Sequence, residues 1–120
     1  MDQAEDLAVL CQAAGKAFTA AGELFVGPTT AGMDWKYLNA TMANGILNAF
    51  GAVSVHPYRP KAPDTVLEDW VRLRELIQQY GTTAAQKAMP FISGEWGYTT
   101  ATDPVGTFVT FSKRSRTCCP

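Results

Sequence analysis

The chain has 120 residues, of which 47% are hydrophobic and 18% are charged, and its formal net charge is −1. This length allows one domain, and the hydrophobic content excludes a disordered chain. A charge so close to zero gives no general attraction to nucleic acid or to an anionic membrane, so we expect neither as a partner. No basic start is followed by a long apolar stretch, which argues against a signal peptide and a membrane span and leaves the localisation open.

Two helices and two strands are predicted in the first half of the chain. Apolar residues recur with helical spacing over residues 2–20, and a short apolar run at 24–26 reads as a strand that ends at a Gly-Pro pair. Asp34 is a good N-cap for a second helix over about 35–50, and residues 52–55 read as a second strand. The expected buried stripe of the first helix comprises Leu7, Leu10, Cys11, Ala14, Ala17 and Phe18.

A strongly patterned helix and a third strand follow. Thr65 and Glu68 have the spacing of a capping box for a helix over 66–80, and Asp69 lies before Arg72 in the order that favours a helical ion pair. The predicted buried face of this helix comprises Leu67, Trp70, Leu73, Ile77 and Tyr80. The third strand is expected at 90–92.

The alternation of helices with short apolar strands predicts an α/β fold with parallel strands. The strand centres recur at a spacing close to the roughly 31 residues per unit of an eight-unit (β/α) barrel. Flavodoxin-like sheets repeat at a similar spacing, so the period does not choose between the two folds. Residues 105–111 are weakly strand-like and residues 113–120 have no apolar period, which indicates an irregular tail over 105–120.

Chemically active side chains collect where parallel strands end. The residues that follow the three expected strands are Thr29 and Thr30, His56 and Tyr58, and Glu95 and Trp96. Glu95 stands between two glycines, and a carboxylate at that place can act as a base, an acid or a nucleophile. The plain alternative is that these are ordinary rim residues: a solvated glutamate, a hydrogen-bonded histidine and a packed tyrosine.

Other chemistries have less support in the sequence. His56 is the only histidine, and no Gly-x-Ser-x-Gly elbow is present for a serine nucleophile. A zinc site from His56, Glu95 and Asp34 has no motif spacing behind it, so we expect no metal and no cofactor. The three cysteines, Cys11, Cys118 and Cys119, give neither a disulfide framework nor a spaced metal motif.

Three strings in the sequence resemble one family. They are Val-Gly-Pro at 26–28, Val-Ser-Val-His-Pro-Tyr-Arg at 53–59 and Ile-Ser-Gly-Glu-Trp-Gly-Tyr at 92–98. They resemble the ends of the fifth, sixth and seventh strands of clan A glycoside hydrolases, and most closely the cellulase-like bacterial members. The resemblance covers about residues 2–102, and the Ser-Gly-Glu-Trp-Gly-Tyr string is its most specific part.

The resemblance implies a (β/α)8 barrel that hydrolyses β-glycosidic bonds with retention, with an oligo- or polysaccharide as partner. Glu95 matches the nucleophile of the family. His56 and Tyr58 match positions that line the sugar site, where the tyrosine in many members hydrogen-bonds the nucleophile. Trp96 is expected to stack on a sugar ring.

The sequence departs from the family in one respect that affects activity. The acid/base glutamate of the family belongs to an Asn-Glu-Pro or similar string after the fourth strand, and no such string occurs here. The expectation is therefore a partial barrel of about three βα units over 1–104, from a truncated or frameshifted gene and inactive on its own. The alternative is a non-catalytic α/β interaction module, or a half barrel that self-associates through its open sheet edges.

Overall fold

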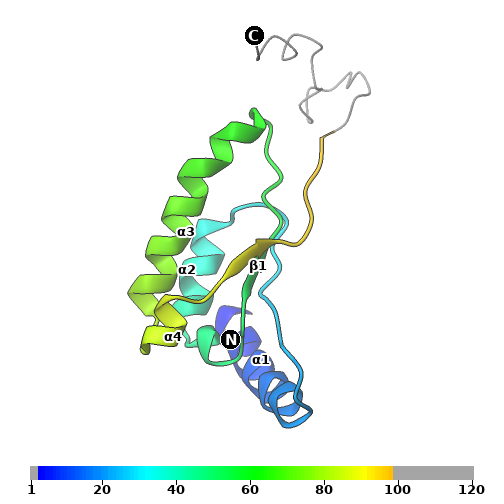
Figure 1. The fold of residues 1–120 in the computed structure, drawn as a ribbon, viewed down its shortest axis with the longest axis vertical. Helices are drawn as coiled ribbons and strands as arrows, with labels where there is room; N and C mark the ends of the chain where they lie inside the picture. Colours follow the sequence, from blue (N-terminus) through cyan, green and yellow to red (C-terminus); the bar gives the residue numbers. More distant parts are fainter. Residues whose placement is uncertain (1–2, 99–120) are drawn as a thin grey trace.

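The computed structural model describes residues 3–98, and more than half of them are helical (Figure 1). In chain order the elements are α1 (Gln3–Ala20), α2 (Trp35–Ala43), the 3-10 turn η1 (Ile46–Asn48), β1 (Val53–Val55), the 3-10 turn η2 (Pro63–Thr65), α3 (Val66–Tyr80), α4 (Ala84–Lys87) and β2 (Phe91–Ser93).

The two strands form a parallel pair, in which Val53 lies opposite Phe91 and Val55 opposite Ser93. α2 and α3 run side by side next to this pair, and α1 packs against α2 and η1 (Figure 1). β1 is buried along its whole length, because its valines pack into the core between the helices. Completely or almost completely buried side chains of that core are Leu38, Met42, Ile46, Val53, Val55, Leu73 and Ile77. The core thus lies between the sheet and the helices, with β1 at its centre.

The predicted fold class, three βα units of a partial (β/α)8 barrel, is wrong. The described residues form a small, mainly helical domain with two short parallel strands. The segment 24–26, expected as the first strand, makes only an isolated parallel bridge from Val26 to Ala52. Two features of the segment account for this: Leu24 is 66% exposed instead of buried, and Pro28 has no N–H to donate to a ladder.

The second helix is shorter than predicted. The Asp34 N-cap is confirmed, since a carboxylate oxygen accepts a hydrogen bond from the Tyr37 N–H at 3.0 Å. The helix ends at Ala43, however, because Gly45 takes a left-handed conformation with φ of 77°. The chain continues in the η1 turn, so the predicted helix over 35–50 is two separate elements.

The predicted buried stripe of α1 is only partly correct. The buried residues are Ala4, Ala8, Cys11 and Gly15, whereas the predicted Leu10 is exposed. The reason is a close helix contact: a Cβ on Gly15 would lie 2.7 Å from the carbonyl oxygen of Ala49. Small side chains allow this approach, so the helix buries its small-residue face instead of its most apolar one.

α3 has the predicted bounds but not the predicted cap. Thr65 makes no side-chain capping bond to the helix, because its hydroxyl donates to the carbonyl oxygen of Ala62 at 2.6 Å. Asp69 pairs with Arg59 and not with Arg72. Of the predicted face, Leu73 and Ile77 are buried, whereas Leu67 is exposed.

The predicted tail over 105–120, with its boundary after residue 104, lies outside the described residues, as do Cys118 and Cys119. Cys11 is a free, buried thiol. Within residues 3–98, no helix combines the length and the apolar character needed to cross a bilayer.

Candidate functional site

The candidate site lies where the two parallel strands end. β1 continues into His56 and β2 into Gly94, and the backbone keeps the two extensions together: the Gly94 N–H donates to the Val55 carbonyl oxygen at 3.0 Å. A third segment reaches the same edge, since the His56 N–H donates to the Thr30 carbonyl oxygen at 3.0 Å. The parallel direction of the strands therefore places residues 30, 56 and 94 next to one another.

The structure brings together three of the four predicted site residues. The Oε2 atom of Glu95 lies 3.2 Å from the Nδ1 atom of His56, and Tyr58 lies close enough to the same carboxylate for Glu95 to raise the pKa of the Tyr58 hydroxyl. The rings of His56 and Tyr58 meet edge to face, with centroids 6.5 Å apart. The Glu95 side chain remains 62% exposed, whereas the His56 side chain is 20% exposed. The carboxylate thus contacts His56, lies beside Tyr58 and is still open to a ligand.

The electrostatics of this cluster act on Tyr58. The hydrogen bond to Glu95 raises the pKa of the Tyr58 hydroxyl above its ordinary value of 10, and desolvation and the carboxylate charge act in the same direction. A phenolate beside a carboxylate would be repelled, and the donated hydrogen bond would be lost. Tyr58 is therefore a neutral donor over the whole physiological range of pH.

Glycine is needed at position 94 for this arrangement. A Cβ there would lie 2.6 Å from the Ser54 hydroxyl oxygen and 3.2 Å from the Nε2 atom of His56. Any side chain at position 94 would therefore crowd the Ser54 and His56 side chains, which lie close to the backbone after β2. This close approach is what brings the Glu95 carboxylate within reach of His56.

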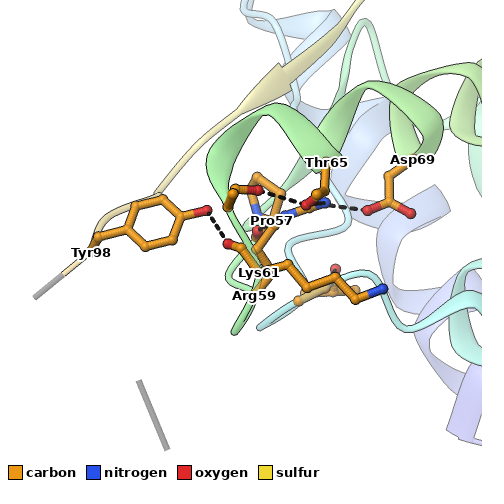
Figure 2. A network of polar contacts seen from close by, with 9 residues as sticks. Pro57, Arg59, Lys61, Thr65, Asp69 and Tyr98 are labelled. Carbon is orange, nitrogen blue, oxygen red and sulfur yellow. Dashed lines mark hydrogen bonds and ion pairs between the residues drawn. The ribbon is translucent and has the colours of Figure 1, made fainter. Parts of the chain in front are cut away.

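The loop after β1 is fixed by Arg59, whose side chain is almost fully buried (Figure 2). One guanidinium nitrogen lies 2.6 Å from a carboxylate oxygen of Asp69, and Nε donates to the Pro57 carbonyl oxygen at 3.2 Å. A third bond, at 3.4 Å, runs to the Thr65 hydroxyl. Figure 2 also shows Tyr98, which donates to the carbonyl oxygen of Lys61 at 3.1 Å. The segment that carries Glu95 is thus tied to the loop that carries Tyr58.

Trp96, the fourth predicted residue, is placed differently. Its ring lies beside the ring of Tyr98, with the two centroids 5.9 Å apart. Its indole Nε1 is buried and has no hydrogen-bond partner in the described part of the chain. The stacking of Trp96 on a sugar ring stays a prediction.

One of the two threonines at the end of the first expected strand, Thr30, has a structural role. The Thr30 hydroxyl is buried and donates to the Gly32 carbonyl oxygen at 2.6 Å, which closes a turn. Asp34, which the zinc alternative requires, caps α2 instead. Among residues 3–98, no three histidine, cysteine or acidic side chains are grouped closely enough to hold a metal ion.

A groove of about 730 Å³ adjoins the cluster. Tyr58 borders it on one side, and Trp35 and the first turn of α3 form other walls. The guanidinium of Arg72 lies 4.2 Å above the Trp35 ring. The groove itself is lined by charged side chains, among them Arg59 and Glu68, and by the aromatic residues Trp35 and Tyr58.

Sequence reasoning missed the residues that support the cluster. Arg59 directly follows the predicted site residue Tyr58. Its basic side chain is the one feature of the sequence that indicated an anchor for the loop after β1. The Tyr98 bond to Lys61 joins residues 37 apart and has no local signal. Comparison with family models, with curated proteins and with solved structures found no match. The function of the chain is therefore inferred from the geometry of the site.

Proposed function

We propose that Glu95 is the nucleophile of a site that cleaves β-glycosidic bonds with retention of configuration. The observation that carries this proposal is the carboxylate cluster: Glu95 is 3.2 Å from His56 and lies beside Tyr58, the two residues that the sequence resemblance assigns to the sugar site. The incomplete barrel is not part of the proposal, which concerns only these three residues.

The chemistry of a retaining glycosidase agrees with this arrangement. The nucleophile must be ionised when it attacks the anomeric carbon, and a neutral hydroxyl that donates to it favours the charged form. His56 also holds the orientation of the carboxylate, because its ring is mostly buried while Glu95 is exposed. The substrate is a β-linked oligo- or polysaccharide, and the groove beside Tyr58 has room for sugar units beyond the one attacked.

The proposal also limits what this chain does by itself. A retaining site needs a second carboxyl group about 5–5.5 Å from the first, to protonate the leaving oxygen. No Asn-Glu-Pro string supplies that group in the 120 residues. Without an acid, glycosides with poor leaving groups lose about 10²–10⁴-fold in rate, so natural polysaccharides are not turned over measurably by the chain alone.

The test therefore uses a substrate that needs no acid. 2-Deoxy-2-fluoro β-glycosides that carry a dinitrophenolate leaving group, in gluco, manno, galacto and xylo forms, are incubated with the purified chain. Intact-mass spectrometry is expected to show one fluoroglycosyl adduct per chain with at least one of these sugars, and peptide mapping to place it on Glu95. Glu95→Gln abolishes the adduct, whereas Glu23→Gln, at an exposed glutamate after α1, retains it.

The rate of adduct formation tests whether Tyr58 positions the Glu95 carboxylate. A neutral hydroxyl beside the carboxylate favours its charged form, so Tyr58→Phe is expected to slow adduct formation. Tyr80→Phe, which removes a hydroxyl bonded to Asn39, is the matched control and leaves the rate unchanged. If no sugar labels the chain, or if labelling survives Glu95→Gln, Glu95 is an ordinary rim residue.

A further inference from the structure

The outer edge of β2 carries backbone groups that are free to pair. The Pro90 carbonyl accepts from the Val53 N–H, and the Gly94 N–H donates to Val55, so residues 90, 92 and 94 direct their backbone groups toward β1. Successive residues of a strand alternate in this respect, so Phe91 and Ser93 direct their N–H and C=O groups to the opposite edge. Within residues 3–98, no hydrogen bond engages these groups at that edge.

The free edge is also apolar at its centre. Ile92 is 46% exposed, although isoleucine is among the residue types most often buried. Its position opposite Ser54 places it on the sheet face away from the buried valines of β1. Proteins usually protect such an edge with charged residues or proline. Pro90 gives no such protection here, because its backbone faces β1 and not the free edge.

We propose that β2 pairs with β2 of a second copy of this chain, antiparallel about a two-fold axis at Ile92. In that register Phe91 of each copy lies opposite Ser93 of the other, and these are the residues with outward backbone groups. Four N–H···O=C bonds form across the axis. The two Ile92 side chains lie opposite each other on the same face and cover each other.

Charge complementarity favours a second copy over an unrelated peptide. Arg74 of α3 reaches the start of β2, where it donates to the Met89 carbonyl oxygen at 2.7 Å and lies 4.7 Å above the Phe91 ring. It has no carboxylate partner within residues 3–98. In the proposed antiparallel arrangement the end of β2 that leads to Glu95 in one copy lies beside the Met89 end of β2 in the other copy. The negative charge of Glu95 and the positive charge of Arg74 are therefore at the same end of the interface, and the two-fold symmetry repeats this at the other end.

The pairing does not depend on the proposed glycosidase function, since it needs only the edge of β2. The primary test is the mass of the full chain in sedimentation equilibrium as concentration rises from about 10 µM to about 1 mM, a range suited to a small interface. The expected result is a shift from one chain of 13.0 kDa to twice that mass. Ile92→Lys places two ammonium groups face to face and keeps the chain monomeric, whereas Val71→Lys, at an exposed position of α3, retains the dimer.

Cross-linking tests the register. In a chain with Cys118→Ser and Cys119→Ser, Ile92→Cys meets its own copy at a Cα separation of about 4.5 Å, within disulfide range, and oxidation gives a covalent dimer. Ser93→Cys lies opposite Phe91 of the other copy and cross-links much more slowly. A chain that stays monomeric to 1 mM, a dimer that persists in Ile92→Lys, or equal cross-linking at positions 92 and 93 would each overturn the proposal.

Discussion

Replacement of Gly94 by alanine tests how closely the site is packed. The new Cβ would lie 2.6 Å from the buried Ser54 hydroxyl oxygen and 3.2 Å from His56 Nε2. Gly94 does not have a positive φ, so the backbone tolerates alanine and the effect is purely one of space. Overpacking of this kind destabilises the folded chain by about 1–3 kcal/mol. Alanine also reduces the conformational freedom of the unfolded chain, which stabilises the fold by about 0.4–1 kcal/mol. The expected net loss in the free energy of unfolding is about 1–2 kcal/mol.

The matched control is Gly97→Ala, because a Cβ at that position meets nothing within 4 Å. Urea unfolding followed by tryptophan fluorescence is expected to show a lower midpoint for Gly94→Ala, and an equal or slightly higher one for Gly97→Ala. Ser54→Ala in the Gly94→Ala chain removes the nearer contact and restores at least half of the loss, as a double-mutant cycle measures. If both glycine variants unfold at the same midpoint, the packing between Gly94 and Ser54 is not as described.

Three further predictions concern the cluster and its support. Because the pKa of Tyr58 is raised in the folded chain, the neutral hydroxyl stabilises the fold fully below pH 10, and this stabilisation is lost as the pH rises through the raised pKa. Glu95→Gln is expected to lower the pKa of Tyr58 toward 10. The absorbance of the phenolate, compared with that of a Tyr58→Phe reference, measures this change. Ile77→Ala, at a fully buried position, lowers the free energy of unfolding in urea by about 2–5 kcal/mol, while changes on the exposed face of α3 stay within about 0.5 kcal/mol. Asp69→Asn removes the charge opposite the buried Arg59 and costs about 1.5–3 kcal/mol in thermal unfolding; an unchanged melting temperature would exclude the pair as a support.

Local signals in the sequence predicted some elements well. Asp34 caps α2 as expected, because an N-cap depends only on the residues that follow it. The second and third expected strands do pair in parallel, and their ends bring Glu95 to His56 and Tyr58. These predictions held because strand ends and caps are set by a few consecutive residues and by the direction of the chain.

The errors arose where a group had more than one possible partner. The Thr65 hydroxyl has the right spacing for a cap, but it bonds Ala62 and Arg59 instead. Asp69 has an arginine one turn later on its own helix, but it forms its ion pair with the buried guanidinium of Arg59. The segment 24–26 has the composition of a strand, but it forms a single isolated β-bridge, from Val26 to Ala52. The spacing of residue types does not predict these outcomes, because each depends on which of several partners is in reach in the folded chain.

The short length of β2 has a consequence for how the site comes apart. The strand that leads to Glu95 has three residues, whose side chains are half-buried or exposed, whereas β1 and the helices share the buried core. Segments with little buried apolar contact open at a lower free energy than the core does. Detachment of β2 therefore separates the carboxylate from the imidazole while the helical body stays folded, and amide exchange at Ile92 and Gly94 is expected to precede exchange at Leu73.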